Sequence, residues 1–456
     1  MVVRRSGSAL TWRDAAVVAL LMVLSLAWSA VGISRAPELT RYDEWTYIDY
    51  AYKVSQGYVP VRGEDLGLVA REAWSCRGME GTIRHVAPPP CEDVASSAVS
   101  EWPYEGENYN GFHPPLYFAL AGFGGKAIAA FTGTDFVTAA RWISGLCVAL
   151  GIGAIYLAIR RWRVGRVASF GGALLTLATP AVAASAVIVH NDAMTPLAGA
   201  AAVWLAARIF VGRNLGWALP TLAMALIAAT RVMSSVGLLA VTVILGVALL
   251  VPRFGGLDAS SRRPLAGIIA GQVGALVVGY VGWTTWQNAR TPADYVPAIS
   301  GYSTEPYDGQ SLGTILWTFI DPYGLTHPVT DWYMQPALDS ELIRQWSTVL
   351  YVFFLALPLV FFCVCLRNGA GRALAGSMLV GPMVTGLVVQ VRELVTAHGF
   401  FRVLSGRYAM ALVPLYAAGA AWLFDRPVAR WVFAGFSGLG YASIILGPLV
   451  SGVSIS

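Results

Sequence analysis

Residues 15–45 read AAVVALLMVLSLAWSAVGI-SRAPELTRYDEW, an uncharged apolar run followed at once by a polar segment rich in acids. The apolar part, residues 15–33, is long enough to cross about 30 Å of hydrocarbon as a helix. It follows Arg4 and Arg5, as in a signal peptide, but it is long for one, so we favour an uncleaved first helix. The stretch therefore predicts a membrane-spanning helix that leads into a polar loop on the far side of the membrane.

The rest of the chain has the composition of a polytopic membrane protein. Of its 456 residues, 56% are hydrophobic and 12% are charged, and long apolar runs recur along it. These runs predict an all-α fold of about eleven spanning helices. The predicted spans lie near residues 15–33, 138–159, 167–189, 193–211, 215–230, 232–251, 265–287, 346–366, 373–390, 408–424 and 431–450.

The arginines set the predicted orientation. They gather in short connections near residues 4–13, 160–166, 253–263, 367–372 and 426–430, where acids are few. Placing these connections in the cytoplasm obeys the positive-inside rule throughout. The alternation then requires the apolar residues 115–131 to form a helix that lies along the membrane surface or dips into it. Ser456 is accordingly predicted outside.

The large first loop, residues 34–136, carries the first candidates for chemistry. Asp43 and Glu44 lie just beyond the first helix, where a carboxylate could deprotonate an incoming hydroxyl group as a general base. Thr40-Arg41-Tyr42-Asp43 also fits a capping box, and acids are favoured in the first turn of any helix. The residues alone leave both interpretations open.

Further candidates are a histidine, a turn carboxylate and two arginines. His113 precedes two prolines, which predict extended backbone and then a helix start whose N–H groups would suit a phosphate, although a plain interfacial turn fits slightly better. Asp192, after Asn191, is a helix cap or a site carboxylate. Arg231 interrupts two apolar runs, so it should face a polar cavity, an anion or the interface. Arg407 either extends to the headgroups or binds a phosphate.

The cysteines fall into two groups. Cys76 and Cys91 lie in the polar first loop, where a disulfide is predicted, whereas Cys147, Cys363 and Cys365 lie in apolar runs. No Walker loop, GxGxxG fingerprint or HExxH motif is present, so nucleotide and zinc-protease chemistry have no support. The net charge of +5 reflects membrane orientation and does not indicate a nucleic-acid partner.

In order and in side of the membrane, these motifs resemble those of the GT-C glycosyltransferases, including protein mannosyltransferases, aminoarabinose transferases and actinobacterial arabinosyltransferases. The likeness rests on Asp43-Glu44, on His113-Pro114-Pro115-Leu116, on the turn carboxylate Asp192, and on Gly406-Arg407-Tyr408. It covers the N-terminal half; beyond residue 251 little more than topology and the Gly-Arg-Tyr turn matches. The soluble C-terminal carbohydrate-binding domain of some arabinosyltransferases and the Trp-Trp-Asp signature of oligosaccharyltransferases are missing.

The resemblance implies an inverting transferase that uses a polyprenyl-phosphate sugar and needs no other cofactor. No motif indicates a divalent metal. Asp43 would be the base, with Glu44 beside it. His113 and Arg407 would bind the donor phosphate, with Arg231 as a further candidate. The sugar or acceptor would contact Asn191, Asp192 and Tyr408. The acceptor would be a glycan, a lipid or a protein at the outer face.

The expected organisation is a GT-C-like catalytic module over residues 1–251, followed by further spans over residues 252–456 with a second outer loop at 288–345. The scarcity of lysine beside abundant arginine suggests a GC-rich bacterial genome. We therefore expect a multi-pass protein of the bacterial cytoplasmic membrane, in contact with its lipids and active on the extracytoplasmic side. The main alternative is a transporter or flippase of a lipid-linked sugar, because charges within a bundle also mark translocation paths.

Overall fold

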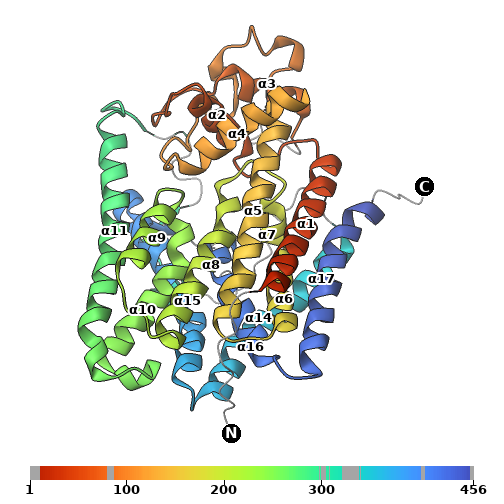
Figure 1. The fold of residues 1–456 in the computed structure, drawn as a ribbon. Helices are drawn as coiled ribbons and strands as arrows, with labels where there is room; N and C mark the ends of the chain where they lie inside the picture. The colour runs from red at the N-terminus through yellow and green to blue at the C-terminus, as the bar shows by residue number, and fades with distance from the viewer. Residues whose placement is uncertain are drawn as a thin grey trace.

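The computed structural model describes residues 11–79, 87–296, 298, 304–307, 309–320, 338, 340–401 and 406–451. The described part is a bundle of helices with a cap at one end (Figure 1). We define the cap as residues 36–135, excluding 80–86. Its α-helices are α2 (Glu44–Ser55), α3 (Leu68–Arg77) and α4 (Leu116–Thr132).

The bundle begins with α1 (Trp12–Arg35) and is built around α5 (Phe136–Arg161), which packs against α1, α4, α6 and α8. The other helices are α6 (Arg166–Leu177), α7 (Pro180–Ser185), α8 (Thr195–Ala206), α9 (Ala218–Ala228), α10 (Val236–Leu250), α11 (Arg262–Asn288), α12 (Leu312–Ile320), α14 (Glu341–Cys365), α15 (Gly369–Ala397), α16 (Val413–Leu423) and α17 (Ala429–Ser451). Strands β1 (Thr304–Pro306) and β2 (Gly399–Phe401) pair antiparallel, with Glu305 opposite Phe400. Packing of α17 on α6 and of α15 on α10 joins helices from both sides of residue 251.

Eight helices in the described residues are long and apolar enough to cross a membrane, so the protein has the all-α, multi-pass architecture that its sequence predicts. Eight of the eleven predicted spans coincide with these helices. The other three, 167–189, 215–230 and 408–424, correspond to shorter α-helical segments: α6 with α7, α9, and α16. The count of eleven therefore remains a prediction.

A proline explains the break in the 167–189 segment. Pro180 begins α7, and its ring disfavours helical backbone at Thr179, so the chain turns between α6 and α7. Carbonyl groups released at such a break need hydrogen-bond donors in an apolar setting. The Trp346 indole N–H donates to the Ala178 carbonyl at 2.7 Å, and the Trp28 indole N–H donates to the Ala183 carbonyl at 2.7 Å. Two neighbouring helices thus stabilise the break.

The arginine-rich connections gather at the end of the bundle opposite the cap, which we call the arginine end. Asp14 at the start of α1 pairs with Arg160 at 3.0 Å and with Arg166 at 3.2 Å. The Gly165 N–H donates to Asp425 at 2.8 Å, which ties the α5–α6 turn to the segment before α17. From there α17 runs back toward the cap end (Figure 1). Which end faces the cytoplasm remains a prediction, and Ser456 lies outside the described residues.

The predicted surface helix is α4, and it belongs to the cap. It packs against α2 and against the first turns of α5. Close packing requires glycine, because a Cβ atom at Gly122 would lie 2.1 Å from the Ala51 carbonyl oxygen of α2. At its far end Phe131 is exposed. How α4 lies relative to a membrane remains a prediction.

Candidate active site at the cap end of the bundle

The cap holds Asp43 in an unusual backbone conformation. Asp43 precedes α2 with φ 64°, in the left-handed region that non-glycine residues rarely adopt. Its side chain makes no capping hydrogen bond to α2, so the capping-box interpretation is not realised. Instead one carboxylate oxygen accepts a hydrogen bond from the Tyr109 hydroxyl at 2.7 Å, and the other lies 3.5 Å from Arg407 Nη2. Left-handed strain of this kind concentrates at functional sites.

The neighbouring acid, Glu44, points into the protein. It forms a fully buried ion pair with Arg141 of α5, with contacts of 2.8 and 2.9 Å from Arg141 Nε and Nη2. Its two oxygens also accept from the backbone N–H groups of Thr40 and Val189, each at 2.9 Å. Every carboxylate oxygen is therefore occupied, and Glu44 has none left for a substrate. The expectation that Glu44 joins the site is corrected: it fastens the cap to the bundle.

His190, Asp192 and Arg231 meet where two turns of the bundle face each other. The Asp192 N–H donates to His190 Nδ1 at 3.0 Å, and the Asp192 carboxylate lies 3.2 Å from the same nitrogen. Its other oxygen forms an ion pair with Arg231, which lies between α9 and α10. On the far side of the imidazole ring, Arg407 Nη1 lies 3.4 Å from His190 Nε2. The Asp192 carboxylate therefore contacts both His190 and Arg231. Arg231 faces a charged partner, as its sequence position predicted.

His113 lies beside these residues, and its side chain is uncharged. Tyr47 links them, because its hydroxyl lies 3.3 Å from His113 Nε2 while its ring packs edge-on against His190 with centroids 4.4 Å apart. Burial, reinforced by the positive charge of Arg231, holds the pKa of His113 well below its usual value. His113 is therefore neutral at pH 7 in this arrangement, and its expected role as a phosphate ligand remains a prediction.

The expected helix start at His113 is also displaced. The helix α4 begins at Leu116, after both prolines, and the Leu116 N–H already donates to the Ala229 carbonyl at 3.3 Å. That donor is therefore taken up by a neighbouring helix and does not point at a ligand. The His113 carbonyl accepts from the Tyr50 hydroxyl at 2.7 Å, which fixes the turn.

Together these side chains form one connected group, which we call the charged cluster: Asp43, Tyr47, Tyr109, His113, His190, Asp192, Arg231, Arg407 and Tyr408. Tyr408 packs against both arginines, with ring centroids 5.7 Å from Arg231 Cζ and 5.5 Å from Arg407 Cζ. Asp43, Arg407 and Tyr408 are its partly exposed members, and 22% of the Asp43 side chain and 13% of the Arg407 side chain are accessible. Solvent or a ligand therefore reaches the cluster at the Asp43–Arg407 pair.

Asn191 lies in the same turn as Asp192 and is fully buried. Neither its amide nitrogen nor its amide oxygen has a hydrogen-bond partner among the described residues. Unpaired buried amides are uncommon, because each costs the free energy of desolvation without compensation. Its predicted contact with a sugar or acceptor remains a prediction.

Sequence reasoning missed several members of the cluster. Tyr109 and Tyr47 were not singled out, and His190 was given no role of its own, although it adjoins the Asn191-Asp192 pair. Burial, followed by the charge of Asp43, raises the pKa of Tyr109 well above its usual value, so its hydroxyl stays protonated and donates. A tyrosine in a loop carries no sequence signal of such a contact, because the contact joins residues far apart in the chain.

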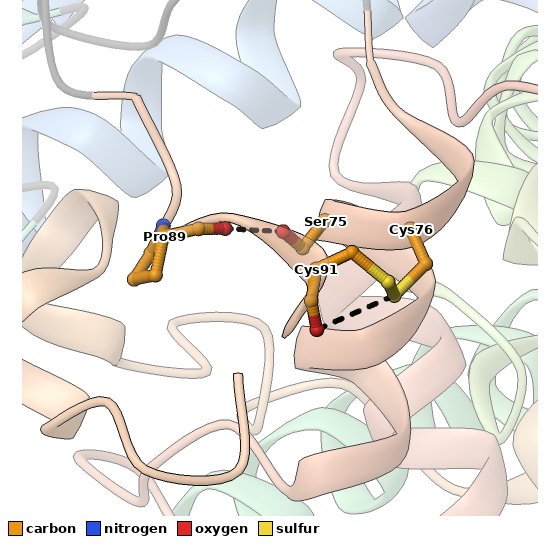
Figure 2. Close-up of a disulfide and its surroundings, with 4 residues drawn as sticks. All are labelled: Ser75, Cys76, Pro89 and Cys91. Carbon is orange, nitrogen blue, oxygen red and sulfur yellow. Dashed lines mark hydrogen bonds between the residues drawn. A yellow bond between two sulfur atoms is a disulfide. The ribbon is translucent and has the colours of Figure 1, made fainter. Parts of the chain in front are cut away.

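The predicted disulfide is present. Cys76 at the end of α3 is bonded to Cys91, and the Ser75 hydroxyl donates to the Pro89 carbonyl beside it (Figure 2). The three free cysteines lie within helices of the bundle. Among the described residues, no group of His, Cys, Asp and Glu side chains is placed to hold a metal ion.

Comparisons with known proteins do not assign this chain to a family. Searches of protein families and of curated proteins find no match for this chain.

Proposed function

We propose that the protein is an integral membrane glycosyltransferase that moves a sugar from a polyprenyl phosphate to an acceptor hydroxyl group, with inversion, on the extracytoplasmic face of a bacterial cytoplasmic membrane. The observation that supports this most is the Asp43–Arg407 pair. It joins a partly exposed carboxylate, in strained backbone, to a partly exposed guanidinium at 3.5 Å. A base beside a cation suits a reaction that removes a proton and releases a phosphate.

In the proposed reaction, Asp43 takes the proton of the acceptor hydroxyl as that oxygen bonds to the anomeric carbon. The bond from the anomeric carbon to the phosphate oxygen breaks, and its electron pair remains on the departing polyprenyl phosphate. Arg407 stabilises that negative charge, since a preorganised cation acts most strongly where charge develops. The Tyr109 hydroxyl, 2.7 Å from one Asp43 oxygen, keeps the carboxylate oriented.

The remaining cluster residues would position these two groups. Arg231 is paired with Asp192, so it orients this carboxylate and adds to the positive potential around a phosphate. His190 is neutral, because burial, and next the charge of Arg407, keeps its pKa well below the usual value. Its ring lies between the two charged groups, with Nδ1 3.2 Å from the Asp192 carboxylate and Nε2 3.4 Å from Arg407. Glu44 has no place in the mechanism.

The test is transfer by the purified full chain in lipid vesicles. Polyprenyl-phosphate mannose and polyprenyl-phosphate arabinose are supplied as radiolabelled donors, with extracted cell-envelope glycans, lipids or proteins as acceptors. We expect release of free polyprenyl phosphate, with Asp43→Asn slower by about a hundredfold to ten-thousandfold while donor binding persists. The matched control is Asp93→Asn, an exposed cap carboxylate outside the cluster.

Full turnover by Asp43→Asn would remove the proposed base. Movement of the labelled lipid across the vesicle bilayer without formation of free polyprenyl phosphate would instead assign the protein to the transporters or flippases.

A further inference from the structure

A second group of arginines lies at the cap end. Its members surround Phe112, whereas the arginines of the charged cluster lie near Asp43 and Asp192. Arg62 of the cap and Arg392 of α15 both face the Phe112 ring, with their Cζ atoms 6.0 and 5.3 Å from its centroid. Arg290, just after α11, lies 4.2 Å over the ring of Trp286. Phe112 immediately precedes His113, so this second group adjoins the charged cluster.

The end of α11 connects these residues. The Trp283 indole N–H donates to the Phe112 carbonyl at 2.7 Å, and Gln287 donates to the carbonyls of Pro60 and Gly111 at 3.1 and 2.9 Å. Arg62 donates to the Asn288 side chain at 3.0 Å. Cap residues 59–62 and 111–112 are therefore fixed to the end of α11 that reaches the cap (Figure 1).

Arg62 and Arg290 have unused hydrogen-bonding capacity. Each guanidinium has five N–H donors, yet Arg62 donates only to Asn288, and Arg290 only to the Val59 carbonyl at 2.7 Å, among the described residues. Arg62 Nε and Arg290 Nη1 are buried with no acceptor in that part of the chain. Burial lowers the pKa of Arg62, and so does the positive charge of Arg392. The positive charges repel one another, so an anion bound between them would be stabilised.

The nearby acids are already engaged. Glu107 accepts from the Tyr295 hydroxyl and from the Ala298 N–H, and Glu393 lies 3.4 Å from Arg392. Within the described ranges, no carboxylate lies within 4.0 Å of Arg62 or Arg290. A bound anion would therefore supply a negative charge that the carboxylates of the described ranges do not place beside Arg62 or Arg290.

The surroundings indicate where such an anion would come from. The candidate span that contains α11 is only 17% buried, so most of its apolar surface is open to contact with lipid. Trp286 and Tyr280 near its end are 43% and 37% exposed, and exposed Trp and Tyr at a span's end mark the level of lipid headgroups. Arginine binds phosphate through two parallel N–H groups. A lipid phosphate fits both the charge and the depth of this site.

We propose that Arg62 and Arg290, at the end of α11, bind the phosphate group of an anionic membrane lipid at a site beside the charged cluster. The acyl chains would lie along the exposed face of α11, and the Trp283–Trp286 pair would contact the headgroup region. Arg392, whose Cζ atom lies 5.3 Å from the Phe112 ring centroid, adds positive potential. The proposal does not depend on glycosyl transfer, because it concerns binding alone.

The test is native mass spectrometry of the purified full chain in detergent micelles that contain dioleoyl phosphatidic acid or dioleoyl phosphatidylcholine. We expect wild type to retain phosphatidic acid preferentially. The double variant Arg62→Gln/Arg290→Gln should bind phosphatidic acid with an affinity reduced about tenfold, because charge-assisted hydrogen bonds are lost. The matched control is Arg344→Gln near the start of α14, which removes one positive charge from an exposed side chain. Arg62→Gln alone serves if the double variant does not fold.

Equal retention of phosphatidic acid by wild type and by the Arg62 variants would overturn the proposal, as would equal retention of the two lipids by wild type. Displacement of the lipid by millimolar inorganic phosphate would assign the site to a free anion and would overturn the lipid assignment. Loss of binding in Arg344→Gln as well would also overturn the proposal, because it would show a general effect of surface charge.

Discussion

Glu44 and Asp43 are adjacent carboxylates, and the structure predicts opposite consequences for the same chemical change at each. Glu44→Gln should destabilise the protein, whereas Asp43→Asn should leave its stability close to wild type. Glu44 and Arg141 are fully buried, and the carboxylate accepts from Arg141, Thr40 and Val189. A glutamine offers one acceptor oxygen, brings an N–H₂ group against these donors and leaves the Arg141 charge uncompensated.

The magnitude follows from that uncompensated charge. Removing one member of a buried ion pair costs about 3–5 kcal/mol, which is a large part of the stability of an ordinary protein. Asp43 is 22% exposed and lies 3.5 Å from Arg407, so solvent screens the pair and its loss costs about 1 kcal/mol or less. Adjacent substitutions should therefore differ by several kcal/mol.

The assay is thermal unfolding of the purified protein in detergent, followed by intrinsic fluorescence and by the fraction that stays monodisperse. Glu44→Gln and Arg141→Met should each melt well below wild type and Asp43→Asn. The double variant Glu44→Gln/Arg141→Met should lose less than the sum, because it leaves no buried charge. A Glu44→Gln protein that melts like wild type but has no transferase activity would refute this reasoning and return Glu44 to the site.

Three further predictions follow from the same contacts. Tyr109→Phe removes one hydrogen bond to Asp43, so we expect transfer to slow about tenfold with little change in the KM for the donor, measured by steady-state kinetics; an unchanged rate would show that Asp43 needs no such support. His113 and His190 have depressed pKa values when folded, so the unfolded chain binds more protons below pH about 6.5, and melting temperatures should fall as the pH drops from 7.5 to 5.5; stability that rises on acidification would contradict neutral histidines. Cys76→Ser/Cys91→Ser opens a loop whose closure is worth about 3 kcal/mol in the chain-entropy model, so the cap should become sensitive to limited proteolysis; cleavage at the wild-type rate would count against that contribution.

The sequence determined the class of fold and the neighbourhood of the site. Apolar runs fix which segments cross a membrane, because the cost of leaving backbone polar groups unpaired in hydrocarbon leaves helices as the solution. Runs such as 15–33 and 232–251 therefore needed no tertiary information. The order of the motifs predicted that Asp43, Asp192, Arg231 and Arg407 would lie at one end of the bundle, and the structure brings them into contact.

Tertiary structure decided what each of these residues does. Asp43 and Glu44 are adjacent in sequence and equal in chemistry. Only the left-handed turn before α2 and the positions of the two arginines direct one to Arg407 and the other to Arg141. The same holds for His113, whose charge state depends on burial and on arginines far away in the chain. Hydropathy is a sum over a local window and can be read from sequence. Side-chain direction and electrostatic potential depend on distances between segments hundreds of residues apart, and these distances exist only once the helices have packed.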